Sequence, residues 1–177
     1  DLRFGAAAEQ IEHAVEVSLR RLGVEHIDLY YVHADDRTVP LEERLESFTR
    51  LRDAGKIRLA GASNIRAWRL EEARGLCNAN GWLDYCCVQQ RFSYVRIQRG
   101  SYYDPHVEAD DAELDYYRNR GLTLLAYSPL LSGAYTRGDR QFPEQYHGPD
   151  TDARMKALNQ VAEAIGATAN QVVLAWM

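Results

Sequence analysis

The residues best suited to chemistry follow four short apolar runs, at the point where each run ends. His33 closes the run I-D-L-Y-Y-V, and two carboxylates, Asp35 and Asp36, come shortly after it. Three later runs end in hydrogen-bonding side chains, namely Ser63 with Asn64, Gln89, and Tyr127 with Ser128. In barrels of alternating strands and helices, chemistry is placed at this end of the strands. The pattern predicts that these side chains lie on one rim, with the histidine as the candidate reactive group.

Each of these residues also has an ordinary structural interpretation. A histidine is often a hydrogen-bonded core residue, Ser63-Asn64 is a common helix-capping pair, and Tyr127 could be a buried strand tyrosine. Asp35 and Asp36 could be metal ligands or acid/base carboxylates, but we expect them to be loop residues on a solvated rim. The other histidines share no spacing with His33 and are expected at the surface; they are His13, His26, His106 and His147.

The elements that must position these residues alternate along the chain. Apolar stripes predict helices at residues 8–22, 41–54, 68–77, 108–119 and 151–165, and from 169 onward. Apolar runs predict strands at residues 27–32, 57–62, 84–89 and 122–127. Near-continuous apolar strands alternating with helices indicate an α/β fold, a parallel sheet covered by helices.

Two architectures fit this alternation, a doubly wound sheet and a (β/α)₈ barrel. A doubly wound sheet would usually carry G-x-G-x-x-G after its first strand, and this sequence has no such motif. The residues at the strand ends favour the barrel. We predict a single domain over residues 1–177 that contains about four strand–helix units of a (β/α)₈ TIM barrel.

Composition and charge exclude several classes of partner. The formal net charge is -5 and the basic residues are interleaved with acidic ones, so we expect no nucleic-acid partner and no membrane partner. No apolar run approaches the roughly 20 residues that span a bilayer. The three cysteines, Cys77, Cys86 and Cys87, lack metal-ligand spacing, and we expect no bound metal. They are expected to be reduced, which fits a cytoplasmic protein.

Three blocks of the sequence carry a family resemblance. S-L-R-R-L-G-V-E-H-I-D-L-Y-Y-V-H ends at His33, L-R-D-A-G-K-I-R-L-A-G-A-S-N ends at Asn64, and A-Y-S-P-L-L-S-G begins just before Tyr127. In this order, the blocks resemble the aldo-keto reductases. The resemblance covers nearly the whole chain.

The resemblance implies roles for eight residues of this chain. His33 would be the active-site histidine that polarises and orients a substrate carbonyl. The residues that hydrogen-bond the nicotinamide carboxamide would be Ser63, Asn64 and Gln89. Tyr127 would stack under the nicotinamide. The cofactor's pyrophosphate would be lined by Ser128, Leu130 and Ser132. The implied cofactor is NADPH, because it is the family's commoner choice.

Two parts of the family pattern have no counterpart in this sequence. The family's proton donor is a tyrosine supported by a lysine and an aspartate, all from early strands, and nothing before Ile27 resembles those strands. The Lys/Arg cluster that grips the 2′-phosphate of NADPH would lie beyond Met177. We therefore expect this sequence to be the middle and later part of a longer enzyme.

Three functions are compatible with the sequence. The first is an NADPH-dependent aldo-keto reductase, which transfers a hydride to a small-molecule aldehyde or ketone to give an alcohol. The second is a non-catalytic, nicotinamide-binding regulatory subunit of the same fold that senses redox state. The third is a half-barrel that dimerises to complete its sheet, so a homo-oligomer remains open.

Overall fold

The computed structural model describes residues 5–101 and 104–177. The four strands are β1 (Ile27–Val32), β2 (Ile57–Ser63), β3 (Tyr85–Arg91) and β4 (Thr123–Tyr127). The α-helices are α1 (Ala8–Leu22), α2 (Leu41–Asp53), α3 (Ala67–Asn80), α4 (Asp111–Arg120), α5 (Pro149–Ile165) and α6 (Ala169–Trp176). Two short 3₁₀ helices, η1 (Leu131–Gly133) and η2 (Glu144–Tyr146), lie between β4 and α5.

The strands form one sheet in the order β1-β2-β3-β4, and β1, β2 and β3 run parallel. A parallel pair needs a crossover connection, and here a helix supplies it between β1 and β2 and between β2 and β3. The predicted α/β class with a parallel, helix-covered sheet is confirmed.

The strand register decides which side chains meet at the ends of the strands. Val32 pairs with Ala62, so His33 follows β1 at the level where Ser63 ends β2. A bulge between Ala60 and Gly61 shifts the pairing of β2 with β3, and beyond it Ser63 pairs with Gln89. The register therefore brings His33, Ser63 and Gln89 to one level. The prediction that the third strand ends at Gln89 was wrong, because β3 continues to Arg91.

The chain folds into two compact units. The first unit comprises the described residues of Asp1–Gln89 and Asp111–Leu125, and the second comprises those of Gln90–Asp110 and Ala126–Met177. Strands β3 and β4 each begin in the first unit and end in the second. The prediction of a single domain stays a prediction.

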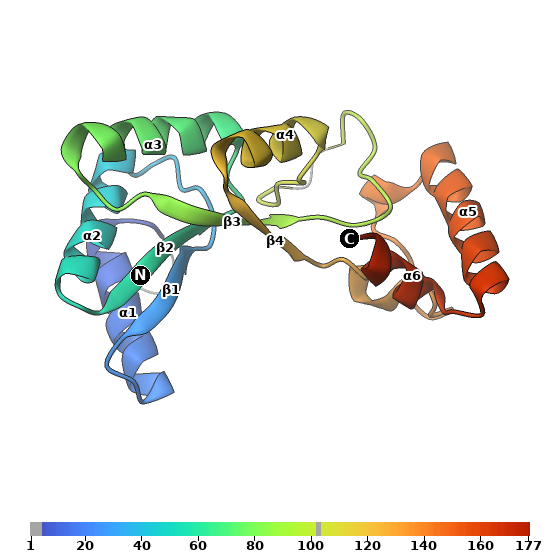
Figure 1. The fold of residues 1–177 in the computed structure, drawn as a ribbon, viewed down its shortest axis with the longest axis horizontal. Helices are drawn as coiled ribbons and strands as arrows, with labels where there is room; N and C mark the ends of the chain where they lie inside the picture. The colour runs from blue at the N-terminus through green and yellow to red at the C-terminus, as the bar shows by residue number, and fades with distance from the viewer. Residues whose placement is uncertain (1–4, 102–103) are drawn as a thin grey trace. The chain divides into compact units, whose positions relative to one another are not determined.

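Within the first unit, the apolar stripe of α2 packs against the sheet. Phe48 is fully buried, with its ring 6.3 Å from that of Tyr30 on β1 and 6.0 Å from that of Tyr85 on β3. Neighbouring helices contact each other in chain order, α1 against α2, α2 against α3, and α3 against α4 (Figure 1). This packing fixes the strands whose ends carry the predicted site residues.

Helix α3 does not use Ser63 or Asn64 as its cap. Its N-cap residue is Arg66, which makes no side-chain capping bond. The carboxylate of Glu113 on α4 accepts the N–H of Ala67 at 3.0 Å and so satisfies one of the open donors of the helix. The capping interpretation of Ser63-Asn64 was wrong, and these side chains make other contacts.

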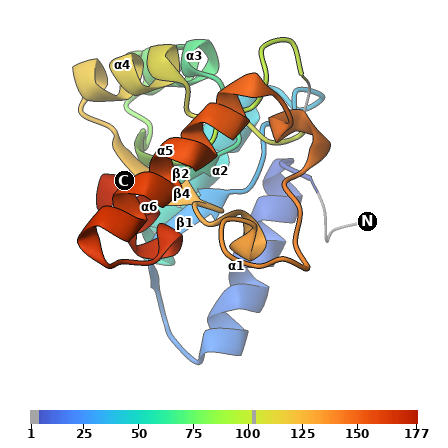
Figure 2. The ribbon, with the colours of Figure 1, turned by 90° about the vertical axis from the view of Figure 1, so that its right-hand side faces the viewer.

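The second unit has its own core. Helices α5 and α6 lie side by side (Figure 2). The buried core residues are Val95, Leu131, Tyr135, Tyr146, Leu158, Ala169 and Val173. In the described part of the chain, no helix is long and apolar enough to cross a membrane.

Candidate functional site

Four of the predicted site residues meet in the first unit, where β1 and β2 end beside Gln89 of β3. The Ser63 hydroxyl donates to the Gln89 carbonyl oxygen at 2.8 Å. The Asn64 side-chain amide donates to the His33 carbonyl oxygen at 3.0 Å and to Ser63 Oγ at 3.2 Å. Ser63 and Asn64 thus link the ends of β1 and β2 to Gln89 of β3 in one hydrogen-bonded group.

Asn64 holds this position in an unusual backbone conformation. Its φ is 52°, in the left-handed region, and only 6% of its surface is exposed. Asparagine visits this region more readily than most residues, because its short polar side chain bonds locally. Strained residues of this kind cluster at binding and catalytic sites.

Two side chains of this group, those of His33 and Gln89, make no hydrogen bond with other described residues. His33 is exposed and Gln89 is half-buried. Within residues 5–101 and 104–177, no hydrogen bond is found for the His33 imidazole or for the Gln89 side-chain amide. These two side chains are therefore available to a ligand, whereas the side-chain donors of Ser63 and Asn64 bond to other groups of the protein.

The loop after His33 is held by a buried ion-pair network, which the sequence analysis missed. The Asp35 side chain is only 5% exposed and its carboxylate faces Arg37, Arg44 and Arg69. The expectation of a solvated rim was therefore wrong for Asp35. One sequence signal could have indicated this network. Arg44 lies three residues after Leu41 and one before Leu45, on the buried stripe of α2, and a buried arginine needs an acidic partner.

The remaining predicted residues lie in the second unit, beginning with Tyr127, the last residue of β4. Tyr127 is half-buried, and Ser128 and Ser132 are exposed. The chain then turns twice, because Leu131 N–H donates to the Ser128 carbonyl at 3.1 Å and Gly133 N–H donates to the Leu130 carbonyl at 2.8 Å.

These turns require left-handed backbone at three residues that are not glycine. The φ angles are 54° at Ser128, 45° at Leu131 and 58° at Ser132. A right-handed residue followed by a left-handed one points backbone N–H groups into an anion-binding concavity, and Leu130 (φ −96°) followed by Leu131 (φ 45°) is such a pair. The chemistry of this segment therefore fits a phosphate-bearing ligand.

His106 contacts Tyr127, although the sequence analysis placed it at the surface. It is half-buried, and its Nδ1 lies 2.9 Å from the Tyr127 hydroxyl oxygen. The two rings are 6.0 Å apart and tilted. Because His106 lies between β3 and α4, 21 residues before Tyr127, no local spacing could have predicted this pair.

The cysteines are free and poorly suited to nucleophilic chemistry. Burial raises the pKa of Cys77 to about 12. Burial, together with the adjacent Cys87 thiol, raises the pKa of Cys86 to about 11. The thiolate is the nucleophilic form, so neither group is activated at neutral pH.

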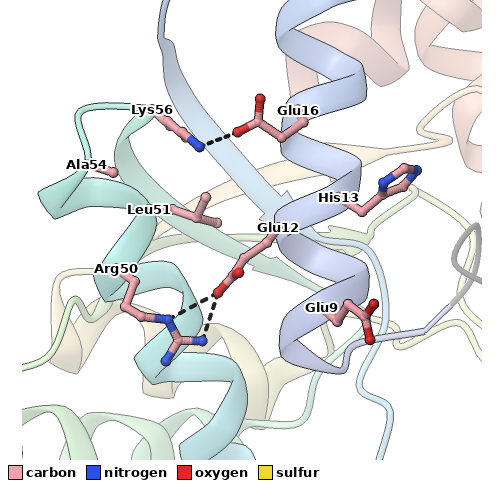
Figure 3. A pocket seen from close by; sticks show the side chains of 8 residues that line it. All are labelled: Glu9, Glu12, His13, Glu16, Arg50, Leu51, Ala54 and Lys56. Carbon is pink, nitrogen blue, oxygen red and sulfur yellow. Dashed lines mark hydrogen bonds and ion pairs between the residues drawn. The ribbon is translucent and has the colours of Figure 1, made fainter.

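A surface cleft of about 510 Å³ lies between α1 and α2 (Figure 3). Four of its charged groups form two ion pairs, Arg50 with Glu12 at 2.7 Å and Lys56 with Glu16. None of its lining residues belongs to the strand-end group. The cleft therefore has no evident part in the chemistry at the strand ends.

The model of the aldo/keto reductase family matches residues 1–177, the entire chain. The chain belongs to the aldo/keto reductase family. Aldo-keto reductase NECHADRAFT_45914 of Fusarium vanettenii is 26% identical over 188 residues, covering 99% of this chain and 48% of that protein. Aflatoxin B1 aldehyde reductase member 2 of Mus musculus is 34% identical over 128 residues, covering 72% of this chain and 32% of that protein. The chain thus spans about half or less of the length of these relatives.

A further relative is the "putative voltage-gated potassium channel subunit beta" of Schizosaccharomyces pombe, 28% identical over 97% of this chain and 52% of that protein. Among solved structures, a "putative 2,5-diketo-D-gluconic acid reductase B" superposes with a TM-score of 0.70 at 24% identity, over 97% of this chain and 49% of the other. This likeness concerns the fold alone, and it identifies the four-stranded sheet and its helices as part of a (β/α)₈ barrel, as predicted.

Proposed function

We propose that this protein is an NADPH-dependent aldo-keto reductase, which reduces an aldehyde or ketone to an alcohol. One observation carries the proposal beyond family membership. Within the described residues, four positions other than glycine have positive φ, and three of them are assigned to the cofactor by the family pattern: Asn64, Ser128 and Ser132. Strain of about 1–3 kcal/mol at each is retained where function requires it.

The residues present fit a nicotinamide dinucleotide. Gln89 offers a side-chain amide, which can both donate to and accept from a carboxamide. Tyr127 offers a half-buried ring whose hydroxyl is already engaged by His106. The turns at Ser128, Leu130 and Ser132 suit a pyrophosphate. When bound, the cofactor supplies the hydride.

His33 would act on the substrate carbonyl. A neutral imidazole donates one N–H and can thereby polarise and orient a carbonyl oxygen. The hydrogen bond from Asn64 to the His33 carbonyl fixes the main chain of the histidine, and its imidazole is exposed. The family pattern assigns no residue of this chain to the proton donor.

The experiment is carbonyl reduction by the purified, natural full-length protein, followed by loss of NADPH absorbance. His33→Ala should lower kcat by about a hundredfold or more, the usual weight of a positioned proton-transfer or polarising group. Its Kd for NADPH should change less than about twofold, since His33 is assigned to the substrate. Wild-type kcat in His33→Ala would contradict the proposal.

The second candidate is a nicotinamide-binding regulatory subunit. The observation that favours it is the similarity to the potassium channel β subunit of Schizosaccharomyces pombe. This candidate predicts tight NADPH binding with no turnover of any carbonyl tested. Binding of NADPH that weakens in Gln89→Ala, without turnover in the wild type, would select it over the reductase.

A further inference from the structure

Arg44 occupies a position on α2 where an apolar side chain would be expected. It lies on the buried stripe with Leu41, Leu45 and Phe48, and none of its surface is exposed. A buried guanidinium loses its hydration, and this cost has to be offset by ion pairs and hydrogen bonds. Its presence in the core therefore needs a specific reason.

The contacts of Arg44 are directed at the loop that follows His33. Nη1 donates to Asp35 Oδ1 at 3.2 Å, and Nη2 donates to the Asp36 carbonyl oxygen at 2.8 Å. One guanidinium group thus holds both a side chain and a main-chain group, two and three residues beyond the histidine. Arginine suits this task because its donors form a rigid, planar fork.

Other residues complete the support of the same loop. Arg37 Nε donates to Asp35 Oδ2 at 3.2 Å, and Arg69 Nε lies 3.6 Å from Asp35 Oδ1. Thr38 closes the loop by donating through its N–H and its hydroxyl to Asp36 Oδ1. At the start of the loop, the Asn64 side-chain amide donates to the His33 carbonyl oxygen. Of these supports, Arg44 alone is fully buried.

We propose that Arg44 is a positioning residue for His33: from the core, it fixes the loop of residues 33–38 through Asp35 and Asp36, and thereby the direction of the imidazole. The inference rests on the proposed function, because His33 is there the residue that acts on the substrate. Arg44 touches neither substrate nor cofactor in this account.

The first test compares two conservative variants on the same helix. Arg44→Lys keeps the charge but cannot reach both partners with one planar group. Arg50→Lys changes an exposed arginine of α2 that pairs with Glu12 in the cleft of Figure 3, and serves as the matched control. In the full-length protein, Arg44→Lys should lower kcat about ten- to a hundredfold, the scale produced by a misplacement of about 1 Å. The Kd for NADPH should stay within about twofold of wild type in both variants, and Arg50→Lys should keep wild-type kcat.

A double variant tests whether the effect passes through His33. If it does, His33→Ala/Arg44→Lys should be no slower than His33→Ala alone. An equal loss of kcat from Arg44→Lys with and without His33 would overturn the proposal, as would wild-type kcat in Arg44→Lys. If Arg44→Lys fails to fold, Asp35→Asn replaces it, because it keeps the shape of the loop and removes the charge that Arg44 meets.

A third measurement does not depend on turnover. Hydrogen exchange of the backbone amides of residues 33–38 should be at least about tenfold faster in Arg44→Lys than in wild type and unchanged in Arg50→Lys, because lost anchoring permits local opening. Unchanged exchange in Arg44→Lys would overturn the proposal. Absence of turnover in the wild type would instead reject the proposed reductase, while the exchange result would still decide whether Arg44 orders the loop.

Discussion

At the scale of single residues, the side-chain donors of Ser63 and Asn64 form hydrogen bonds within the protein. The family pattern assigns both to the nicotinamide carboxamide, yet the Ser63 hydroxyl donates to Gln89 and the Asn64 amide donates to His33. Their contribution is therefore in part indirect, because they hold the main chain of the two residues whose side chains remain available.

Substitution of Asn64 should separate stability from activity. Asn64→Ala loses the bond to His33, about 0.5–1.5 kcal/mol, and forces alanine into the left-handed region, about 1–2 kcal/mol; we expect a total loss near 2 kcal/mol. Asn64→Gly loses the bond but relieves the strain, so its stability should stay within about 1 kcal/mol of wild type. Both should lower kcat by about tenfold or more, since the His33 main chain loses its anchor.

Denaturant unfolding and steady-state kinetics of the two variants check this prediction. Asn64→Asp is the control of similar shape, because it places a carboxylate against the His33 carbonyl and should also lose activity. A fully active Asn64→Gly would show that the hydrogen bond to His33 does not matter for the reaction.

The hydrogen bond between His106 and Tyr127 should contribute to cofactor binding through the orientation of the tyrosine ring. Tyr127→Phe and His106→Ala should each weaken NADPH binding by about two- to tenfold, the value of one hydrogen bond of 0.5–1.5 kcal/mol. The double variant should be no weaker than either single variant, since both remove the same contact. Fluorescence titration measures the Kd, and additive losses would refute the coupling.

Cys86 should react slowly with alkylating agents, because the residue as a whole is exposed but its thiol is partly desolvated. Its pKa, raised to about 11 by burial and by the neighbouring thiol, leaves about one thiol in a thousand ionised at pH 8, against about a quarter of a free cysteine. Because the thiolate reacts, the rate with iodoacetamide should rise about tenfold per pH unit from pH 8 to about pH 10. Peptide mapping by mass spectrometry measures it; a rate that levels off near pH 9 would contradict the raised pKa.

At the scale of elements, β2 approaches β1 and β3 so closely that one of its positions has no room for a side chain. A Cβ at Gly61 would lie 2.5 Å from Tyr31 Cε1 on β1 and 3.0 Å from Cys87 Sγ on β3. Gly61→Ala should therefore destabilise the protein by about 1–3 kcal/mol, the usual cost of overpacking.

Gly75 provides the matched control for this substitution. It lies exposed within α3, and a Cβ there would meet nothing within 4 Å. Gly75→Ala should stabilise the protein by about 0.5–1 kcal/mol, because alanine loses less entropy in a helix. Denaturant unfolding compares the two, and a Gly61→Ala variant as stable as wild type would refute the close approach.

The positions of the elements could be read from the sequence, but their tertiary contacts could not. Apolar periodicity placed β1 at the residues observed and α1 at Ala8–Leu22, because burial of one face selects that periodicity. The Glu113 cap of α3, the His106–Tyr127 bond and the Asp35 network join residues that are far apart or differ in element. Such contacts depend on how the elements pack in three dimensions, and local sequence periodicity does not predict that packing.

The grouping of the candidate site residues was predictable from the strand pattern, whereas their roles stay predictions. The strand ends gave His33, Ser63, Asn64 and Gln89 as one group, and the parallel register brings their main chains together. The strained backbone at Ser128, Leu131 and Ser132 could not be foreseen, since serine and leucine do not ordinarily favour positive φ.

At the scale of the whole molecule, family membership is shown and the reaction is proposed. The chain belongs to the aldo/keto reductases and spans 48% of the Fusarium vanettenii relative. The proposed reaction also requires a proton donor, which the family pattern does not place in residues 1–177. Activity is therefore a property to be measured on the natural full-length protein.

The most direct measurement follows the hydride itself. The full-length protein is given NADPH carrying two deuterium atoms at C4 of the nicotinamide, together with an aldehyde, and the alcohol is analysed by mass spectrometry. We expect one deuterium on the carbinol carbon, formed at wild-type rate by the Arg50→Lys control and about a hundredfold more slowly by His33→Ala. NADPH that binds but leaves no deuterium in any product would contradict the reductase and indicate a nicotinamide sensor.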